Sequence, residues 1–152
     1  MASDDTHARL ADRLAIQDLR YRYCYLIDDG DLAALPALFT EDVNLDYGGM
    51  GTYDGHDGVA EFAALVESTL QRTTHLVTNS LVDVDGDRAS GRHYVLSSVT
   101  FDDGTGGWRI GQYVDEYRRV DGEWLIAEAQ LRFTHSMDYD AETGWGDFRP
   151  HF

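Results

Sequence analysis

The sequence predicts a single α+β domain in which helices come first and a mainly antiparallel sheet follows. Apolar residues recur at helical spacing as far as about residue 70. After Thr73 apolar and polar residues alternate for about sixty residues, as they do in half-buried strands. Asp-Gly and Gly-rich segments interrupt this alternation where hairpin turns are expected. Helices followed by an antiparallel meander indicate a sheet wrapped over the helices.

Three helices are expected, at about 6–29, 31–39 and 58–70. Gly30 ends the first helix, and Asp31 and Asp57 are suitable N-cap residues for the second and third. Pro36 lies inside the second helix and leaves its start open. A short strand at 43–47 and a glycine-rich turn at 48–51 connect the second helix to the third.

Four long strands are expected, at roughly 74–84, 88–101, 108–119 and 124–134. Strict alternation puts His75, Val77, Asn79 and Leu81 on one face of the first of them. Both faces of all four strands mix polar and apolar residues. This pattern fits a curved sheet with one face on a polar-spotted cavity and the other in a subunit interface, and it also fits an ordinary solvent-facing sheet. On the first interpretation we expect a homo-oligomer, either a dimer or a trimer.

The composition limits the classes of partner. The 152 residues include 12 basic and 28 acidic ones, which gives a formal net charge of -16. So acidic a surface repels phosphate backbones and anionic lipids, so no nucleic acid and no membrane is expected as a partner. No apolar run approaches the ~20 residues of a membrane-spanning helix, and we expect a cytoplasmic protein. One domain over 1–152 is expected, with its core at about 7–134 and a C-terminal tail at 135–152.

Asp28 and His75 are the main candidates for chemistry. Asp28 closes the first helix, where a carboxylate is electrostatically unfavourable and has either a solvated role or a specific cationic partner. A carboxylate that orients an imidazole is the minimal equipment for removing a proton from carbon or water. Tyr23, on the packed side of the helix, and Tyr47 could donate to a developing oxyanion. The alternative roles are structural: a solvated helix-end acid, a strand histidine and core tyrosines.

Further polar residues are candidates for lining a substrate pocket. They are Asn79, His93, Ser97 and Gln112. The six histidines are scattered, without a metal-binding pair in one element, so no metal is predicted. Motifs of nicotinamide, nucleotide and serine-hydrolase chemistry are missing, so no cofactor is predicted. Cys24 is the only cysteine and is expected to be a small buried hydrophobe rather than a nucleophile.

The last feature of the sequence is a set of short segments, at residues 14–19, 27–31, 38–42, 51–55, 74–75 with Asn79, 83–89, 111–113 and 117–124. Together these segments resemble the SnoaL-like family of the nuclear transport factor 2-like superfamily. The resemblance covers about residues 7 to 134 and implies a cone-shaped α+β barrel whose bent sheet and helices enclose a deep pocket. Within the family the chain is most similar to the dehydratase and dehydrochlorinase branch, which includes scytalone dehydratase, bile-acid dehydratase and hexachlorocyclohexane dehydrochlorinase.

The resemblance also assigns residues. In that branch an aspartate near the end of the first helix and a histidine that opens the long sheet form a catalytic dyad, and they match Asp28 and His75. A tyrosine of the bile-acid dehydratases matches Tyr23. The second carboxylate of those enzymes falls on Ser97 here, and the pocket tryptophan of the dehydrochlorinase falls near Leu45. Neither specific substrate therefore carries over.

The predicted function is a cofactor-independent lyase or isomerase that acts on a hydrophobic oxygenated small molecule such as a polyketide, steroid or terpenoid. His75 is expected to be the general base, oriented by Asp28, and Tyr23 or Tyr47 to assist the departing oxygen. Three alternatives stay open: a non-catalytic small-molecule-binding domain of this fold, an enzyme of the polyketide cyclase or epoxide hydrolase type, and a structural subunit like the small subunits of ring-hydroxylating dioxygenases.

Overall fold

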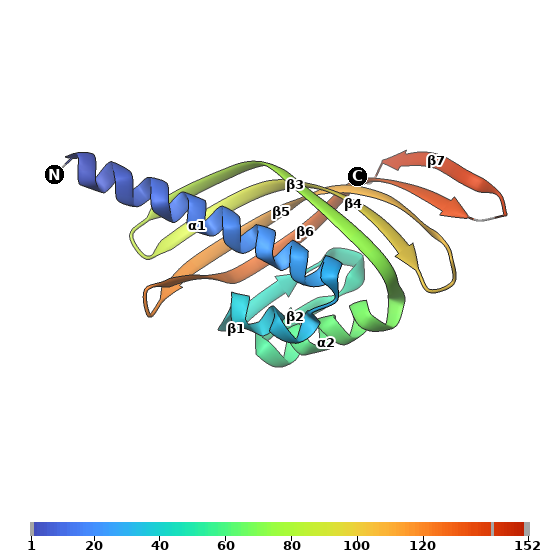
Figure 1. Ribbon diagram of the computed structural model, residues 1–152, viewed down its shortest axis with the longest axis horizontal. Helices are drawn as coiled ribbons and strands as arrows, with labels where there is room; N and C mark the ends of the chain where they lie inside the picture. The colour runs from blue at the N-terminus through green and yellow to red at the C-terminus, as the bar shows by residue number, and fades with distance from the viewer. Residues whose placement is uncertain (1, 141, 151–152) are drawn as a thin grey trace.

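The computed structural model describes residues 2–140 and 142–150 (Figure 1). The helical elements are α1 (Ala2–Asp29), η1 (Leu32–Leu38), η2 (Gly48–Met50) and α2 (Gly55–Thr69). The strands are β1 (Phe39–Asp46), β2 (Thr52–Asp54), β3 (Leu70–Asp85), β4 (Arg88–Phe101), β5 (Gly106–Val120), β6 (Glu123–Asp140) and β7 (Gly144–Pro150). Most of the helical residues precede the long strands, which confirms the α+β class. Among the described residues, no helix combines the length and apolar character needed to cross a membrane.

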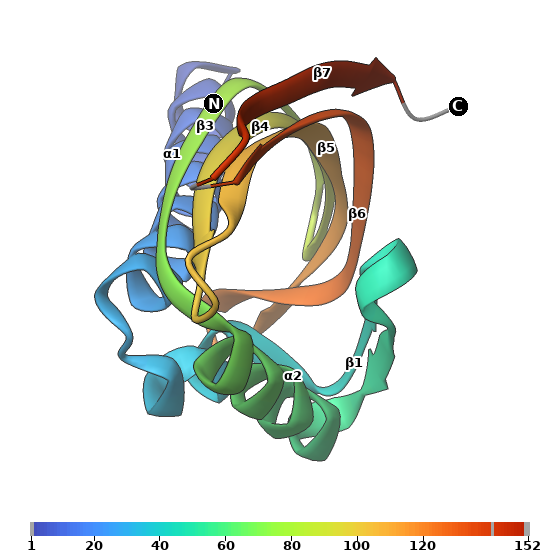
Figure 2. The same ribbon diagram turned by 90° about the vertical axis from the view of Figure 1, so that its right-hand side faces the viewer.

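All seven strands belong to one strongly curved sheet. Its order is β2-β1-β6-β5-β4-β3, with β7 paired to the far end of β6. β1 runs parallel to β6, and the other neighbouring strands are antiparallel. The two end strands of this order, β2 and β3, do not pair with each other, so the sheet forms an open cone (Figure 2). The cone-shaped fold expected from the resemblance is confirmed.

Helix α1 crosses the sheet obliquely (Figure 1). Polar contacts at three levels of the helix join it to the strands. Asp12 accepts a hydrogen bond from the Trp124 indole and forms an ion pair with Arg119. One level further along the helix, Arg20 forms an ion pair with a carboxylate of β5, and at the last level Asp28 contacts β3. Between these contacts the helix buries apolar residues three or four positions apart, namely Ile16, Leu19, Tyr23 and Ile27. The helix ends where Gly30 takes a φ of +77°, as expected.

Strand β3 departs from strict alternation at Asn79. This residue has a φ of +51°, and the β3–β4 register shifts between Thr78 and Leu81. Asparagine tolerates the left-handed region better than most residues because its short amide bonds locally, and the Asn79 amide oxygen accepts from the Thr78 hydroxyl at 3.0 Å. Beyond this bulge Ser80 and Val82 point inward, while Asn79 is exposed. The expectation that Asn79 shares a face with His75 is therefore wrong.

The segment expected as a C-terminal tail consists of the end of β6 and the strand β7, which form a hairpin. Strand β6 continues to Asp140, and β7 returns antiparallel to it, with Tyr139 opposite Trp145. The turn forms because one Asp140 carboxylate oxygen accepts the backbone N–H groups of Glu142 and Thr143, both at 2.9 Å. The last two residues of the expected tail, 151–152, lie outside the described residues.

The positive φ of Asn79 in the bulge leads to a prediction about the stability of the fold. Asn79→Val should lower the free energy of unfolding by about 1–2 kcal/mol, because a β-branched residue is strained at positive φ. Asn79→Gly should leave it unchanged or raise it slightly, because glycine has no Cβ to strain. Urea unfolding followed by circular dichroism measures both values. A valine variant as stable as the glycine variant would contradict the bulged conformation.

Candidate active site

The Asp28 carboxylate holds His75 with both of its oxygens. Oδ1 lies 2.6 Å from the His75 ring nitrogen Nδ1, and Oδ2 accepts the His75 backbone N–H at 2.8 Å. Strand β3 is the edge of the sheet, so half of its backbone N–H groups point away from any neighbouring strand, and the carboxylate takes one of them. Both side chains are largely shielded from water, with 16% of Asp28 and 13% of His75 exposed.

The contact also fixes the tautomer of His75. A carboxylate only accepts hydrogen bonds, so the proton lies on Nδ1 and the lone pair on Nε2. An imidazole in this tautomer, held by a carboxylate on its other nitrogen, is equipped to act as a general base. In the structure, the Asp28 carboxylate and the His75 ring are therefore in direct contact.

His75 lines a cavity of about 530 Å³ between the helices and the concave face of the sheet. This volume is in the range of small-molecule sites. Most of the lining is apolar: Ile27, Met50, Phe62, Leu65, Val66, Leu70, Val99, Phe101, Leu131 and Phe133. The polar side chains are few: Tyr23, Thr69, Thr73, His75, Ser97, Arg109 and Tyr113.

The two candidate tyrosines lie at different places. Tyr23 lines the cavity, and burial raises the pKa of its phenol well above the ordinary value, so it remains an O–H donor at neutral pH. Tyr47 is buried against Phe62, with the ring centroids 4.9 Å apart, and is not part of the cavity lining. Burial raises the pKa of Tyr47 to about 12. The geometry therefore favours Tyr23 over Tyr47 as a group that reaches a ligand.

The four expected pocket residues divide in the same way. Ser97 lines the cavity and pairs with His75 across β3 and β4. A separate depression is bordered by the other three, Asn79, His93 and Gln112. The His93 side chain is nevertheless buried and lies in a polar cluster outside the main cavity.

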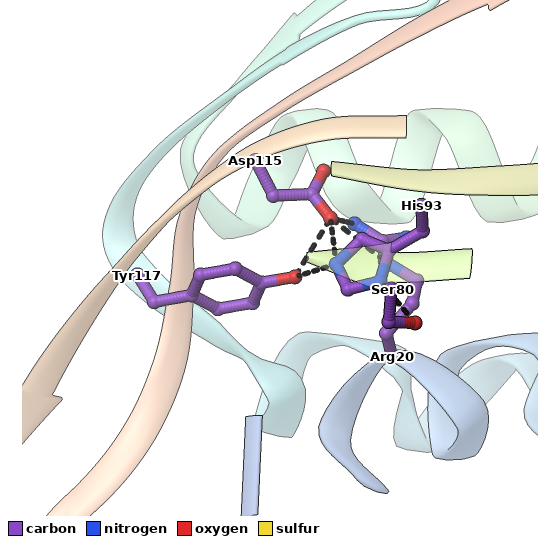
Figure 3. Close-up of polar contacts among 5 residues, drawn as sticks. All are labelled: Arg20, Ser80, His93, Asp115 and Tyr117. Carbon is purple, nitrogen blue, oxygen red and sulfur yellow. Dashed lines mark hydrogen bonds and ion pairs between the residues drawn. The ribbon is translucent and has the colours of Figure 1, made fainter. Parts of the chain in front are cut away.

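This cluster joins Arg20, Ser80, His93, Asp115 and Tyr117 (Figure 3). Arg20 and Asp115 are fully buried, and the guanidinium approaches one carboxylate oxygen at 2.7 and 3.0 Å. The Tyr117 hydroxyl donates to that oxygen at 2.8 Å. Its own oxygen then accepts from His93 Nε2 at 3.0 Å, and the Ser80 hydroxyl donates to Nδ1 at 2.8 Å. The chain of donors satisfies a neutral imidazole.

The electrostatics agree with this assignment. Burial, together with the nearby Arg20 cation, lowers the pKa of His93 from 6.5 to about 4. Burial raises the pKa of Asp115, an effect opposed by Arg20 and the Tyr117 hydrogen bond. Burial also raises the pKa of the Cys24 thiol to about 12, which leaves it unreactive as a nucleophile at neutral pH.

Arg20 also contacts two tyrosines that line the cavity. Its guanidinium carbon lies 4.7 Å from the ring centre of Tyr23 and 4.2 Å from that of Tyr113, and both rings line the cavity. The ion pair with Asp115 thus supports the tyrosines from behind. Sequence reasoning did not find Arg20, because an arginine in a helix with a weak apolar stripe is expected on the solvent side.

The cavity lining also includes polar residues that the sequence did not single out, among them Thr73 and Arg109. Thr73 lies two positions before His75 on the same face, and its hydroxyl is buried without a hydrogen-bond partner among the described residues. Arg109 lies opposite Ser97 on β5. Period-two alternation from His75 could have found Thr73. Among the residues with a described placement, no group of three or more His, Cys, Asp or Glu side chains is arranged to hold a metal ion.

Comparison with known proteins gives consistent results. The model of the SnoaL-like domain matches residues 8–130. Hexachlorocyclohexane dehydrochlorinase 1 of Sphingobium indicum is 31% identical over 123 residues, which is 79% of this chain and 80% of that protein. The crystal structure of a scytalone dehydratase-like protein of Novosphingobium aromaticivorans superposes with a TM-score of 0.82 at 28% identity, covering 91% of this chain and 95% of the other.

Uncharacterized proteins of Mycobacterium tuberculosis and Mycobacterium bovis are 33% identical over 95 residues. This match covers 62% of the chain and 65% of those relatives, so the similarity spans about two thirds of their length.

The neutral state of His93 predicts a pH dependence of stability. Below pH 6.5 the unfolded chain takes up a proton at this residue and the folded chain does not, so stability falls as the pH drops from 6.5 to about 4. The shift corresponds to a loss of about 3 kcal/mol over that interval. Urea unfolding between pH 7.5 and 4.5 measures it.

The control is His93→Gln, which keeps a hydrogen-bonding side chain without a titratable group. Asp115 contributes with the opposite sign, because a raised carboxyl pKa adds stability as the pH falls. The difference between wild type and variant therefore isolates His93. A difference that does not change with pH would show that the His93 pKa is not lowered.

Proposed function

Because the chain belongs to the SnoaL-like domain family, we propose that it is a cofactor-independent lyase or isomerase that acts on a hydrophobic oxygenated small molecule. The observation that carries the proposal is the double hydrogen bond from Asp28 to His75. This contact fixes the tautomer that a general base requires, and His75, unlike the equally fixed His93, lines the cavity. The dehydrochlorinase and dehydratase-like relatives support an elimination or a proton transfer as the reaction type.

The reaction begins with removal of a proton by His75 Nε2 from a carbon beside a carbonyl or a leaving group. In an elimination, the C–H electrons form the new double bond and the leaving group departs with its electron pair. In an isomerisation, the same electrons form an enolate that is reprotonated at another carbon. Asp28 stabilises the imidazolium formed in either case, and the Tyr23 phenol donates to the oxygen on which negative charge develops.

General-base catalysis contributes only about 10²–10⁴-fold. The remaining rate enhancement comes from the cavity, which excludes water and holds the reacting carbon against His75. Its volume of about 530 Å³ and its apolar lining suit a compact polyketide, steroid or terpenoid.

Substitution of the dyad tests the proposal. With 2-tetralone, a hydrophobic ketone with acidic C–H bonds, the wild-type protein should speed deuterium uptake from D2O. His75→Gln should lower the rate by about 10²–10⁴-fold because the base is lost. Asp28→Asn should lower it less, because the imidazole remains but its cation loses its counter-charge. Mass spectrometry measures the uptake, and circular dichroism checks that each variant folds.

A folded His75→Gln protein with wild-type exchange would refute the mechanism. Mass spectrometry of small molecules retained on native purification then identifies the natural ligand, and the same pair of variants is assayed with it.

We also infer a homo-oligomer, a dimer or a trimer. The convex side of β3, β4 and β5 exposes neighbouring apolar side chains, which are Leu76, Leu81, Tyr94 and Val114. So many exposed large apolar groups on one sheet face are typical of a subunit interface. The net charge of -16 opposes self-association at low salt, so association should strengthen as salt rises.

Light scattering coupled to size-exclusion chromatography tests this state at 0.15 M salt. Wild type should have the mass of a dimer or trimer, and Leu76→Asp should shift it towards the monomer. Leu14→Asp, on α1, is the matched control, because Leu14 is 54% exposed and Leu76 53%. A monomeric wild-type protein would rule the inference out.

A further inference from the structure

A row of polar side chains crosses the concave face of the sheet at the level of His75. His75 pairs with Ser97 across β3 and β4, and Ser97 pairs with Arg109 across β4 and β5. Residues paired in this way point to the same face, and neighbouring strands lie about 4.8 Å apart. Arg109 therefore lies about 10 Å from His75 along the sheet, and both side chains line the same cavity.

Arg109 supplies a positive charge that the rest of the cavity lacks. The chain has no lysine, so every permanently positive side chain is an arginine. Among the residues that line the described cavity, Arg109 is the one arginine. Elsewhere the net charge of -16 repels anions, so an anionic group entering the cavity finds its favourable position here.

The guanidinium of Arg109 is held but retains capacity for a ligand. Nη1 donates to the Trp108 carbonyl at 3.0 Å, and Nη2 lies 2.9 Å from Asp138 Oδ1. A guanidinium carries five N–H donors, so these two contacts do not exhaust it. Arg109 is 21% exposed and Asp138 41%, so the ion pair is partly in water, where such pairs are weak. An incoming acceptor can share the guanidinium.

Arg109 also lies where the cavity adjoins a second hollow. This hollow, of about 340 Å³, is lined by Phe101, Thr105, Gly106, residues 138–140 and the start of β7. An elongated molecule with one end at His75 thus passes Arg109 where it leaves the apolar cavity.

We propose that Arg109 binds the carboxylate of an amphiphilic substrate whose apolar body fills the cavity and whose reacting carbon lies at His75. The position of the reacting carbon at His75 depends on the proposed function. The position of the carboxylate depends only on the cavity and Arg109. A planar guanidinium matches a carboxylate with two parallel hydrogen bonds, which a neutral alcohol does not reproduce. The backbones of the two residues that would hold the substrate's ends lie two strand spacings, about 10 Å, apart.

Calorimetric titration with octanoate and octan-1-ol tests the charged end, because the two probes share a chain length and differ in charge. Wild type should bind octanoate at least tenfold more tightly than octan-1-ol. Arg109→Gln should abolish this preference by weakening octanoate at least tenfold and leaving octan-1-ol unchanged. Arg109→Lys, which keeps the charge but not the planar fork, should be intermediate.

Arg118→Gln is the matched control, since Arg118 pairs with Asp42 at the surface, away from the cavity. It should bind both probes as wild type does. Equal affinity of wild type for the two probes, no detectable octanoate binding, or wild-type octanoate binding by Arg109→Gln would each overturn the inference.

A further variant distinguishes failure of the Arg109 inference from failure of the proposed function. His75→Gln should keep the preference for octanoate over octan-1-ol, because this preference depends on Arg109 and not on the base. Loss of the octanoate preference only in His75→Gln would overturn the assignment to Arg109. An active His75→Gln protein whose octanoate binding still depends on Arg109 would leave this inference standing and remove the reaction mechanism alone.

Discussion

The placement of α1 on the sheet is the constraint on which the rest of the structure depends. Asp12, Arg20 and Asp28 follow one another at equal intervals of about 12 Å along the helix and contact successively β5 and β6, then β5, then β3. The middle contact is the fully buried ion pair with Asp115, and losing one partner of such a pair costs about 3–5 kcal/mol. Because the helix is rigid, this pair also sets the height at which Asp28 meets the sheet edge.

The same ion pair shapes the environment of the cavity. Arg20 lies against the rings of Tyr23 and Tyr113, and these two rings, not the charged groups behind them, line the cavity. Burial raises the pKa of both phenols, and each remains a hydrogen-bond donor. The neutral His93 completes the cluster without adding a second buried cation. The interior of the cone thus contains both a buried polar cluster and an apolar cavity.

Much of the fold could be predicted from the sequence because its signals are local. Gly30, the Asp-Gly turns and the alternation after Thr73 are read directly from neighbouring residues. The bulge at Asn79 could not be predicted, since alternation does not show where a strand adopts positive φ. Sequence spacing and the family resemblance together predicted the contact between Asp28 and His75. The prediction for His93 failed because the same sheet face lines the cavity at one level and the buried polar cluster at another. The Arg20–Asp115 pair spans 95 positions and leaves no local signal.

The contact between Asp28 and the backbone of His75 has a consequence for how this protein behaves at high concentration. An open sheet edge presents unpaired N–H groups that can recruit a strand from another molecule and begin aggregation. Strand β3 is such an edge, and Asp28 occupies one of its donors with a charged group beside the covering helix. One carboxylate therefore orients the proposed base and also blocks strand addition, so its loss is expected to affect the shelf life of the protein as well as its chemistry.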